Sequence, residues 1–123
     1  MMTGSIILRR WASSIRTVDR ETYARYVAET GTADYARTGG NLGYQMLLSD
    51  RDDGTTRVET LSWWTSYDAI RAFAGDDFHI ARYYPQDDQF LLSKPQHVEH
   101  AEVVIDGLSL DRSGPGEATL GPA

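Results

Sequence analysis

The sequence predicts an α+β fold in which one four-stranded antiparallel sheet carries helices on one face. Two patterns predict it. Apolar and polar residues alternate in four segments, as in half-buried strands, and apolar residues recur at helical spacing in two others. These segments follow one another as β-α-β-β-α-β, the split βαβ order of ferredoxin-like domains. A chain of 123 residues is long enough for one such domain with its own core.

The first strand is predicted over residues 6–16, which alternate and are rich in β-branched side chains. A helix is expected to follow, with Asp19 as its N-cap and with Val18 and Tyr23 in contact as a hydrophobic staple. Gly31 is expected just beyond the end of this helix, where a left-handed backbone is common.

The second and third strands are predicted as a hairpin. Residues 42–49 and 57–64 both alternate, and the polar turn 50–54 separates them. The sequence Thr-Ser-Tyr-Asp at 65–68 matches a capping box, so a second helix is expected there, ending at Gly75.

The C-terminal part is predicted to hold one more short helix and the last strand. Residues 76–84 have a helical pattern before Pro85, and residues 97–104 alternate. From residue 106 onward there are too few apolar side chains to offset the entropy of ordering. We therefore expect one domain over 1–105 and a flexible tail over 106–123.

Composition excludes several classes of function. The chain has no Cys, which removes disulfide scaffolds, zinc–thiolate sites, Fe–S clusters and Cys nucleophiles. Its formal charge of −6 argues against binding to nucleic acid, which needs a basic face. The apolar run at 6–8 is too short for a signal or a membrane span. We expect a soluble, cytoplasmic protein without nucleic-acid or membrane partners.

Large apolar side chains fall on both faces of the predicted sheet. In the first strand Ile7 and Trp11 alternate with Leu8, and in the third Trp64 alternates with Trp63. Helices of the same chain cover only one face, so the other needs a partner. A second copy of the chain is the simplest partner, and we expect a homodimer.

The segment from 61 to 75, in which Trp64 ends a strand before a capped turn and an Ala-Ile-x-x-Phe helix, resembles the antibiotic biosynthesis monooxygenase-like family. Residues 83–88 and 97–104 resemble one subgroup of it, and the resemblance covers about residues 5–105. The family consists of small dimeric α+β barrels and includes cofactor-free oxygenases of aromatic polyketides and haem-degrading enzymes. The resemblance therefore implies a dimeric α+β barrel.

The resemblance also implies part of a site. Family oxygenases and haem degraders use an Asn, a Trp and an Arg or His around the substrate. Trp64 matches the family motif and is implied to line the substrate cavity. The single Asn of this chain, Asn41, lies in a Gly-rich turn and does not match the family's position.

The histidines are candidates for acid–base chemistry. His97 and His100 are three residues apart on a strand and face opposite ways, so they do not share a metal ion, and no metal site is expected. His100 shares a face with Glu102, an arrangement that suits a general base with a pKa near neutral. The alternative is a structural cross-strand pair. His79 is a rival base or haem ligand, or a solvated surface residue.

Aromatic residues are candidates for substrate binding. Trp63 faces away from Trp64 and fills either core, an interface or a binding site. Tyr26 and Tyr83 either contact the substrate or are buried with satisfied hydroxyls. Trp64 and His100 are predicted to bound one cavity, which Tyr83 or His79 closes from the helical side.

These observations and the resemblance favour a cofactor-independent monooxygenase that acts on an aromatic or polyketide-type small molecule in secondary metabolism. A base would deprotonate the substrate, and the carbanion would then reduce O2 without a cofactor. The expected partners are the aromatic substrate, O2 and a second copy of the chain. Two alternatives stay open: a cofactor-free cyclase or isomerase, and a non-catalytic dimer that binds a small ligand.

Overall fold

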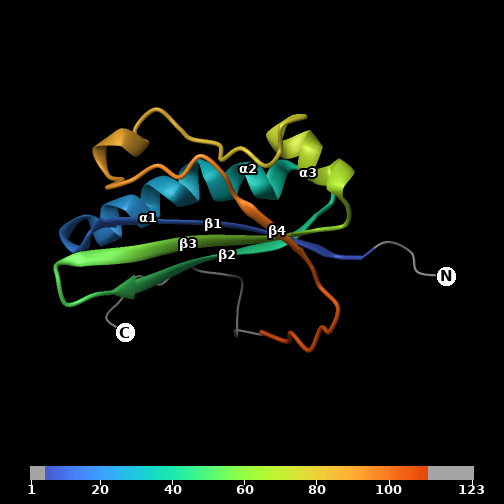
Figure 1. Ribbon diagram of the computed structural model, residues 1–123, viewed down its shortest axis with the longest axis horizontal. Coiled ribbons are helices and arrows are strands. Elements are labelled where there is room, and N and C mark those ends of the chain that lie inside the picture. Colours follow the sequence, from blue (N-terminus) through green and yellow to red (C-terminus); the bar gives the residue numbers. More distant parts are fainter. Residues whose placement is uncertain (1–4, 111–123) are drawn as a thin grey trace.

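The structure is a computed structural model that describes residues 5–110. Four strands form one antiparallel sheet in the order β2-β3-β1-β4: β1 (Ile7–Arg16), β2 (Asn41–Asp50), β3 (Thr55–Trp64) and β4 (Glu99–Glu102). Three helices lie on one face of this sheet (Figure 1): α1 (Arg20–Glu29), α2 (Gly31–Arg37) and α3 (Tyr67–Ala74). The predicted α+β fold and its split βαβ order are confirmed.

The central strands β1 and β3 pair along their whole length, with Ile7 opposite Trp64. Residues that are opposite each other in register lie on the same face of the sheet. Every second side chain of β1 and of β3 therefore points toward the helices. Ile15, Val58 and Trp64 on that face are fully buried. Two apolar clusters result, one around Trp64 under α2 and α3, and one around Ile15 under α1.

The start of α1 differs from the prediction. Val18 lies in a 3₁₀ turn, η1 (Thr17–Asp19), that points it outward, and it is 84% exposed. The predicted hydrophobic staple between Val18 and Tyr23 is therefore wrong. The Asp19 carboxylate does not cap the helix and instead accepts hydrogen bonds from Arg16. Gly31 begins α2 rather than ending α1, because the chain bends at Thr30.

The second predicted helix is present as α3. Ser66 is its N-cap and accepts a hydrogen bond from Ala69 N (3.1 Å), and Gly75 ends it with a φ of 89°. Gly40 joins this helix to β2: its carbonyl accepts from Thr65 N (2.9 Å). The φ of Gly40 is +89°, and a Cβ there would lie 2.4 Å from the Ala69 Cβ.

The prediction of a helix over residues 76–84 is wrong. There the backbone pairs with a later part of the chain: Ile80 bridges His97, and Ala81 N donates to Gln96 O (2.7 Å). An amide used across two segments is not free for an intrahelical bond. The last strand is shorter than expected and is reduced to β4.

We call residues 76–98 the roof segment. It contains one 3₁₀ turn, η2 (Asp87–Gln89), and lies on the same side of the sheet as the helices (Figure 1). Polar bonds tie it to β1: Leu92 N donates to Ser14 O (2.9 Å), and Ser13 Oγ donates to Ser93 O (2.6 Å). The roof segment therefore covers β1 on the face of the sheet that also carries the helices.

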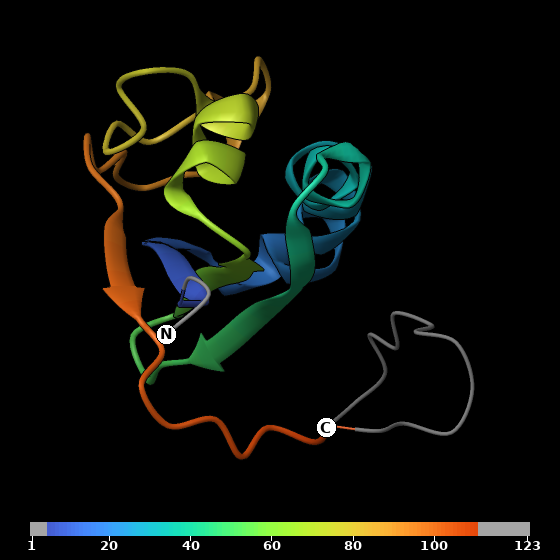
Figure 2. The ribbon, with the colours of Figure 1, turned by 90° about the vertical axis from the view of Figure 1, so that its right-hand side faces the viewer.

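The other face of the sheet, which we call the open face, carries no helix (Figure 2). Leu8, Leu61 and Trp63 project from it, and residues 103–110 run beneath it. Part of that segment, with Trp63, lines a groove. Residues 106–110 are exposed, while 111–123 of the predicted tail lie outside the described residues. Among the described residues, no helix has the length and apolar character to cross a membrane.

Candidate functional site

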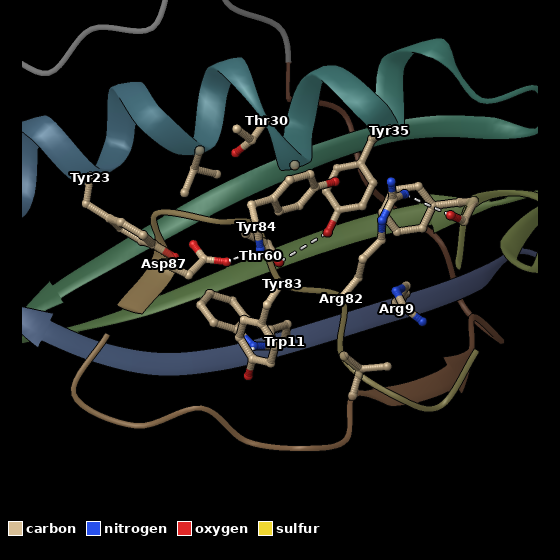
Figure 3. A pocket seen from close by; sticks show the side chains of 14 residues that line it. Arg9, Trp11, Tyr23, Thr30, Tyr35, Thr60, Arg82, Tyr83, Tyr84 and Asp87 are labelled. Atoms are coloured by element: carbon tan, nitrogen blue, oxygen red, sulfur yellow. Dashed lines mark hydrogen bonds between the residues drawn. The ribbon is translucent and has the colours of Figure 1, made fainter. Parts of the chain in front are cut away.

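A cavity of about 60 Å³ lies between the helix-covered face of the sheet and the roof segment. This volume holds a few water molecules or one small group of a ligand. Its walls are drawn in Figure 3 and consist of Arg9, Trp11, Tyr23, Val27, Thr30, Gly31, Tyr35, Thr60, Phe73, Arg82, Tyr83, Tyr84, Asp87 and Val98.

The floor of the cavity follows from strand alternation. Arg9 and Trp11 are two apart on β1, and Thr60 lies opposite Trp11 on β3, so all three face the helices. Tyr23 of α1 and Tyr35 of α2 form the wall above them. The Tyr35 hydroxyl lies 3.3 Å from Thr60 Oγ1 and joins this wall to the floor.

Asp87 is the single carboxylate among the lining residues. It is 6% exposed, and its Oδ2 accepts a hydrogen bond from Tyr84 N (2.6 Å). Burial raises the pKa of Asp87 above its ordinary value, although the Tyr84 hydrogen bond and Lys94 oppose this. A buried carboxylate with a raised pKa, facing a cavity, is a candidate proton acceptor.

Two phenols of the cavity, those of Tyr23 and Tyr83, are held in their protonated form by burial. Burial raises the pKa of Tyr23, and it also raises the pKa of Tyr83. Tyr83 is fixed in place: its hydroxyl accepts from Trp11 Nε1 (3.1 Å) and donates to Pro95 O (2.5 Å). The Tyr23 hydroxyl has no partner among the described residues, whereas the other phenols of the cavity do. Tyr23 is thus a free hydrogen-bond donor beside Asp87 (Figure 3).

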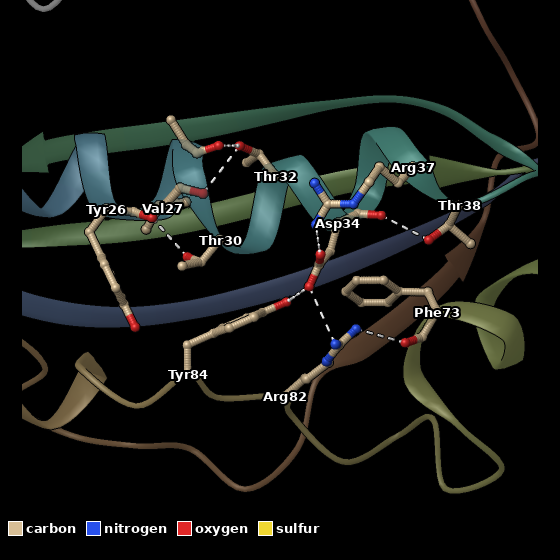
Figure 4. Close-up of polar contacts among 11 residues, drawn as sticks. Tyr26, Val27, Thr30, Thr32, Asp34, Arg37, Thr38, Phe73, Arg82 and Tyr84 are labelled. Carbon is tan, nitrogen blue, oxygen red and sulfur yellow. Dashed lines mark hydrogen bonds and ion pairs between the residues drawn. The ribbon is translucent and has the colours of Figure 1, made fainter.

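A polar network at the rim joins α2 to the roof segment (Figure 4). Asp34 accepts hydrogen bonds from the Tyr84 hydroxyl and from Arg37, and Arg82 Nη2 lies 3.3 Å from its Oδ2. The Tyr84 hydrogen bond, with help from Arg82 and Arg37, holds the pKa of Asp34 below its usual range. Asp34 is therefore an anion that neutralises arginines rather than a base.

Arg9 is a buried cation, 3% exposed. Its Nη1 donates to Phe78 O and contacts His100 Nε2 (3.2 Å), and its Nη2 donates to Ile80 O (3.4 Å). Its guanidinium carbon lies 5.6 Å from the centre of the Phe73 ring. Within the described part of the chain, Arg9 forms no ion pair with a carboxylate.

His100 differs from the prediction in its acid–base properties. Burial, with the charge of Arg9 and the nearby His79, lowers the pKa of His100 to about 4, so the expected value near neutral is wrong. Arginine only donates, so Nε2 of His100 accepts from Arg9 and the proton lies on Nδ1, which is buried without a partner. Glu102, the expected partner, is exposed and forms no hydrogen bond with His100.

Trp64 is fully buried, and its Nε1 donates to Ser62 Oγ (2.8 Å). Its ring packs against Tyr35 and Phe73, with ring centres 6.0 and 5.5 Å away. Trp64 and His100 lie on the same face of the sheet, as predicted, since Arg9 pairs with both Ser62 and His100. The structure does not bring them to a common cavity, because neither is among the lining residues.

The other predicted substrate contacts are divided. Tyr83 lines the cavity. Tyr26 does not; its hydroxyl accepts from Gln86 N (3.0 Å) at the outer side of the roof segment. Trp63 projects from the open face, and His79 is exposed with its ring edge-on to His100 at 5.2 Å.

Sequence reasoning missed Arg9 and Asp87. Arg9 had a signal, because it is a charged residue between Ile7 and Trp11 on the apolar side of the first strand. Asp87 lies in the 3₁₀ turn η2, which is too short to show a periodicity that would mark it as buried. Across residues 5–110, no group of three or more His, Asp or Glu side chains is arranged to hold a metal ion.

Comparison with known proteins gives the fold. No family model matches the chain, and no curated protein sequence matches it. A candidate antibiotic biosynthesis monooxygenase from Bacillus cereus matches at 17% identity, over 86% of this chain and 100% of that one, with a TM-score of 0.54. A second, from Caulobacter crescentus, matches at 16% identity over 84% and 93%, with a TM-score of 0.56.

A heme-degrading protein from Mycobacterium tuberculosis also matches, at 16% identity over 86% of this chain and 99% of that one, with a TM-score of 0.50. The chain therefore has the fold of antibiotic biosynthesis monooxygenase-like and dimeric α+β barrel proteins over most of its length. At these identities the match concerns the fold alone.

Proposed function

We propose that the protein is a cofactor-independent oxygenase of an aromatic small molecule in secondary metabolism, that it acts as a homodimer, and that the cavity beneath the roof segment is its reaction site. The observation that carries this proposal is Asp87, a buried carboxylate with a raised pKa at one end of an aromatic cavity. The shared fold with candidate monooxygenases is consistent with it.

In this proposal Asp87 is the catalytic base. It removes a proton from a CH2 group that carbonyl and aryl neighbours acidify, as in an anthrone, and a carbanion forms. Its raised pKa makes it a stronger base than an ordinary carboxylate. The carbanion gives an electron to O2, the two radicals combine to a hydroperoxide, and loss of water leaves a carbonyl. The CH2 group and O2 become C=O and H2O, and the substrate supplies all the electrons.

The walls of the cavity serve the same step. Trp11, Tyr35 and Phe73 exclude water from the carbanion, which water would otherwise reprotonate. The Tyr23 hydroxyl, which lacks a partner among the described residues, donates a hydrogen bond to the developing oxyanion of the substrate. Tyr83, held by two hydrogen bonds, fixes the position of Trp11.

Trp64 and His100 act as positioning residues in this proposal. Trp64 supports Tyr35 and Phe73 from the core, and His100 accepts a hydrogen bond from Arg9. His100 does not supply the base, because Arg9 occupies its Nε2 lone pair and its pKa is about 4.

The test is O2 uptake by the purified full chain with an anthrone, compared with the rate without protein. Asp87→Asn is expected to lower kcat by about 100-fold or more, the contribution of a general base. Asp88→Asn is the matched control, since that neighbouring carboxylate is exposed and paired with Lys94. Its rate is expected to stay near that of the unchanged protein.

Two results would contradict the proposal. The first is an Asp87→Asn variant that is folded and as active as the control. The second is an unchanged protein that consumes no O2 with anthrones or quinols. Proton exchange or ring closure of the same compounds without O2 would indicate the isomerase or cyclase alternative.

A further inference from the structure

Arg9 is a charge without a counter-ion at the floor of the cavity. A guanidinium taken out of water loses hydration, and proteins offset that loss with a carboxylate or another anion. Arg9 is 3% exposed, yet no described carboxylate forms an ion pair with it. Its partners are two carbonyl oxygens, a neutral imidazole and the face of Phe73. These are dipoles, and none carries a negative charge.

Arg9 also has unused donors. Of the five N–H groups of a guanidinium, three meet the carbonyls of Phe78 and Ile80 and Nε2 of His100. The Nε–H group and one Nη2 hydrogen have no acceptor among the described residues. A carboxylate accepts two parallel hydrogen bonds from a guanidinium, which is the strongest pairing available to a buried arginine.

The second arginine of the cavity shows the difference. Arg82 is ion-paired with Asp34, and Arg37 shares the same carboxylate. Arg9 and Arg82 lie at one end of the cavity, away from Tyr23 and Asp87 at the other (Figure 3). The Arg9 end thus has more positive than negative charge. Burial lowers the pKa of Arg9, Tyr35 opposes this shift, and the charge of Arg82 adds to it.

We propose that the ligand of this cavity carries a carboxylate, or a planar oxyanion of the same shape, and that Arg9 is the residue that binds it. If the proposed function holds, this ligand is the substrate, and the inference rests on that function only for this identification. A substrate held by its carboxylate at Arg9 directs its other end toward Asp87 and Tyr23. Arg9 is then the residue that decides which carbon of the substrate meets the base.

The experiment titrates the full chain with acetate, and separately with acetamide, its neutral counterpart, at constant ionic strength. Acetate is small enough for the cavity and has no reactive C–H of the proposed kind. Binding is followed by NMR on the Arg9 Nε–H resonance, which shifts when that group gains an acceptor. Acetate is expected to shift it saturably, and acetamide is not.

Because Arg9→Gln and Arg9→Lys lack this Nε–H group, acetate affinities of the variants and of the unchanged protein are compared on the backbone amide resonances of Trp11 and Phe73, which line the cavity. Arg9→Gln is expected to weaken acetate binding by about tenfold or more, the effect of losing hydrogen bonds to a charged group. Arg9→Lys keeps the charge and is expected to weaken it less. Arg10→Gln is the matched control, because Arg10 is the next residue of β1, lies outside the cavity lining and is ion-paired with Glu59, and its acetate affinity should stay within a few-fold of the unchanged protein.

An Arg9 Nε–H resonance that acetate does not shift, or that acetamide shifts equally, overturns the proposal. So does a folded Arg9→Gln or Arg9→Lys variant with unchanged affinity for acetate. If Arg9→Gln fails to fold, the acetate and acetamide titrations of the unchanged protein and the acetate affinity of Arg9→Lys still test the proposal. Acetate binding at Arg9 without O2 uptake would leave this inference standing and remove the oxygenase, and O2 uptake without acetate binding would do the reverse.

Discussion

His100 owes its acid–base behaviour to its neighbours, and this makes a prediction about stability. Its pKa is about 4 in the folded protein, against an ordinary value of 6.5. Between these pH values the unfolded chain binds more protons at this site than the native state does. Its contribution to stability is therefore complete above pH 6.5 and is lost as the pH falls toward 4.

His100→Gln should flatten the dependence of the free energy of unfolding on pH in that window, as measured by urea unfolding at several pH values. His97→Gln, a change at an exposed histidine, should keep the slope of the unchanged protein. An NMR titration that places the His100 pKa near 6.5 would refute this account.

At the scale of single residues, alternation in the sequence was enough to place Trp63 and Trp64 on opposite faces, and the family resemblance selected Trp64 for the side of the cavity. It was not enough to find the neighbours of His100. Arg9 is 91 positions away in sequence, and it reaches His100 because β1 pairs with β4. The pKa of a partly buried histidine depends on such long-range neighbours, and no local pattern records them.

At the scale of elements, the junction between β2 and α3 depends on Gly40. Its positive φ and the 2.4 Å approach to the Ala69 Cβ leave no room for a side chain. Gly40→Ala is expected to lower the free energy of unfolding by about 1–3 kcal/mol, from backbone strain and the displacement of α3. Thermal or urea unfolding measures it.

Gly39→Ala is the control for this prediction, because nothing lies within 4 Å of a Cβ at Gly39. It should be neutral or slightly stabilising, since alanine restricts the unfolded chain. Equal effects of the two substitutions would show that the close approach at Gly40 does not matter.

The strands of the sheet and α3 were predictable from the sequence, since each has its own periodicity or cap. The roof segment was not. Its conformation depends on bonds to distant strands, such as Arg9 to Phe78 O and Ser13 to Ser93 O, rather than on a local repeat. Of the residues that line the cavity, Tyr83 was predicted from the sequence, whereas Arg9 and Asp87, the proposed base, were missed.

At the scale of the whole molecule, the apolar open face predicts a homodimer. Light scattering at micromolar concentration should give twice the chain mass of 13.8 kDa. Trp63→Glu should shift the protein toward the monomer, because it places a charge on that face. A monomer as the single species of the unchanged protein would contradict the prediction.

A chain ending at Ile105 is the second variant for this measurement. It should stay dimeric, with a melting temperature within a few degrees, because residues 106–110 are exposed and add little burial. A large loss of thermal stability would mean that the removed residues dock on the sheet of either copy.

The attachment of the roof segment also affects how fast a ligand enters and leaves the cavity. Ligand pockets for drug-sized molecules are about 300 Å³ or larger, whereas this cavity has about 60 Å³. Under the proposed function, an aromatic molecule larger than this volume reaches Asp87 when the roof segment is displaced, and hydrogen bonds at Leu92 and Ser13 hold that segment to β1. Association is then governed by how often the roof opens rather than by diffusion, and bound molecules leave slowly for the same reason.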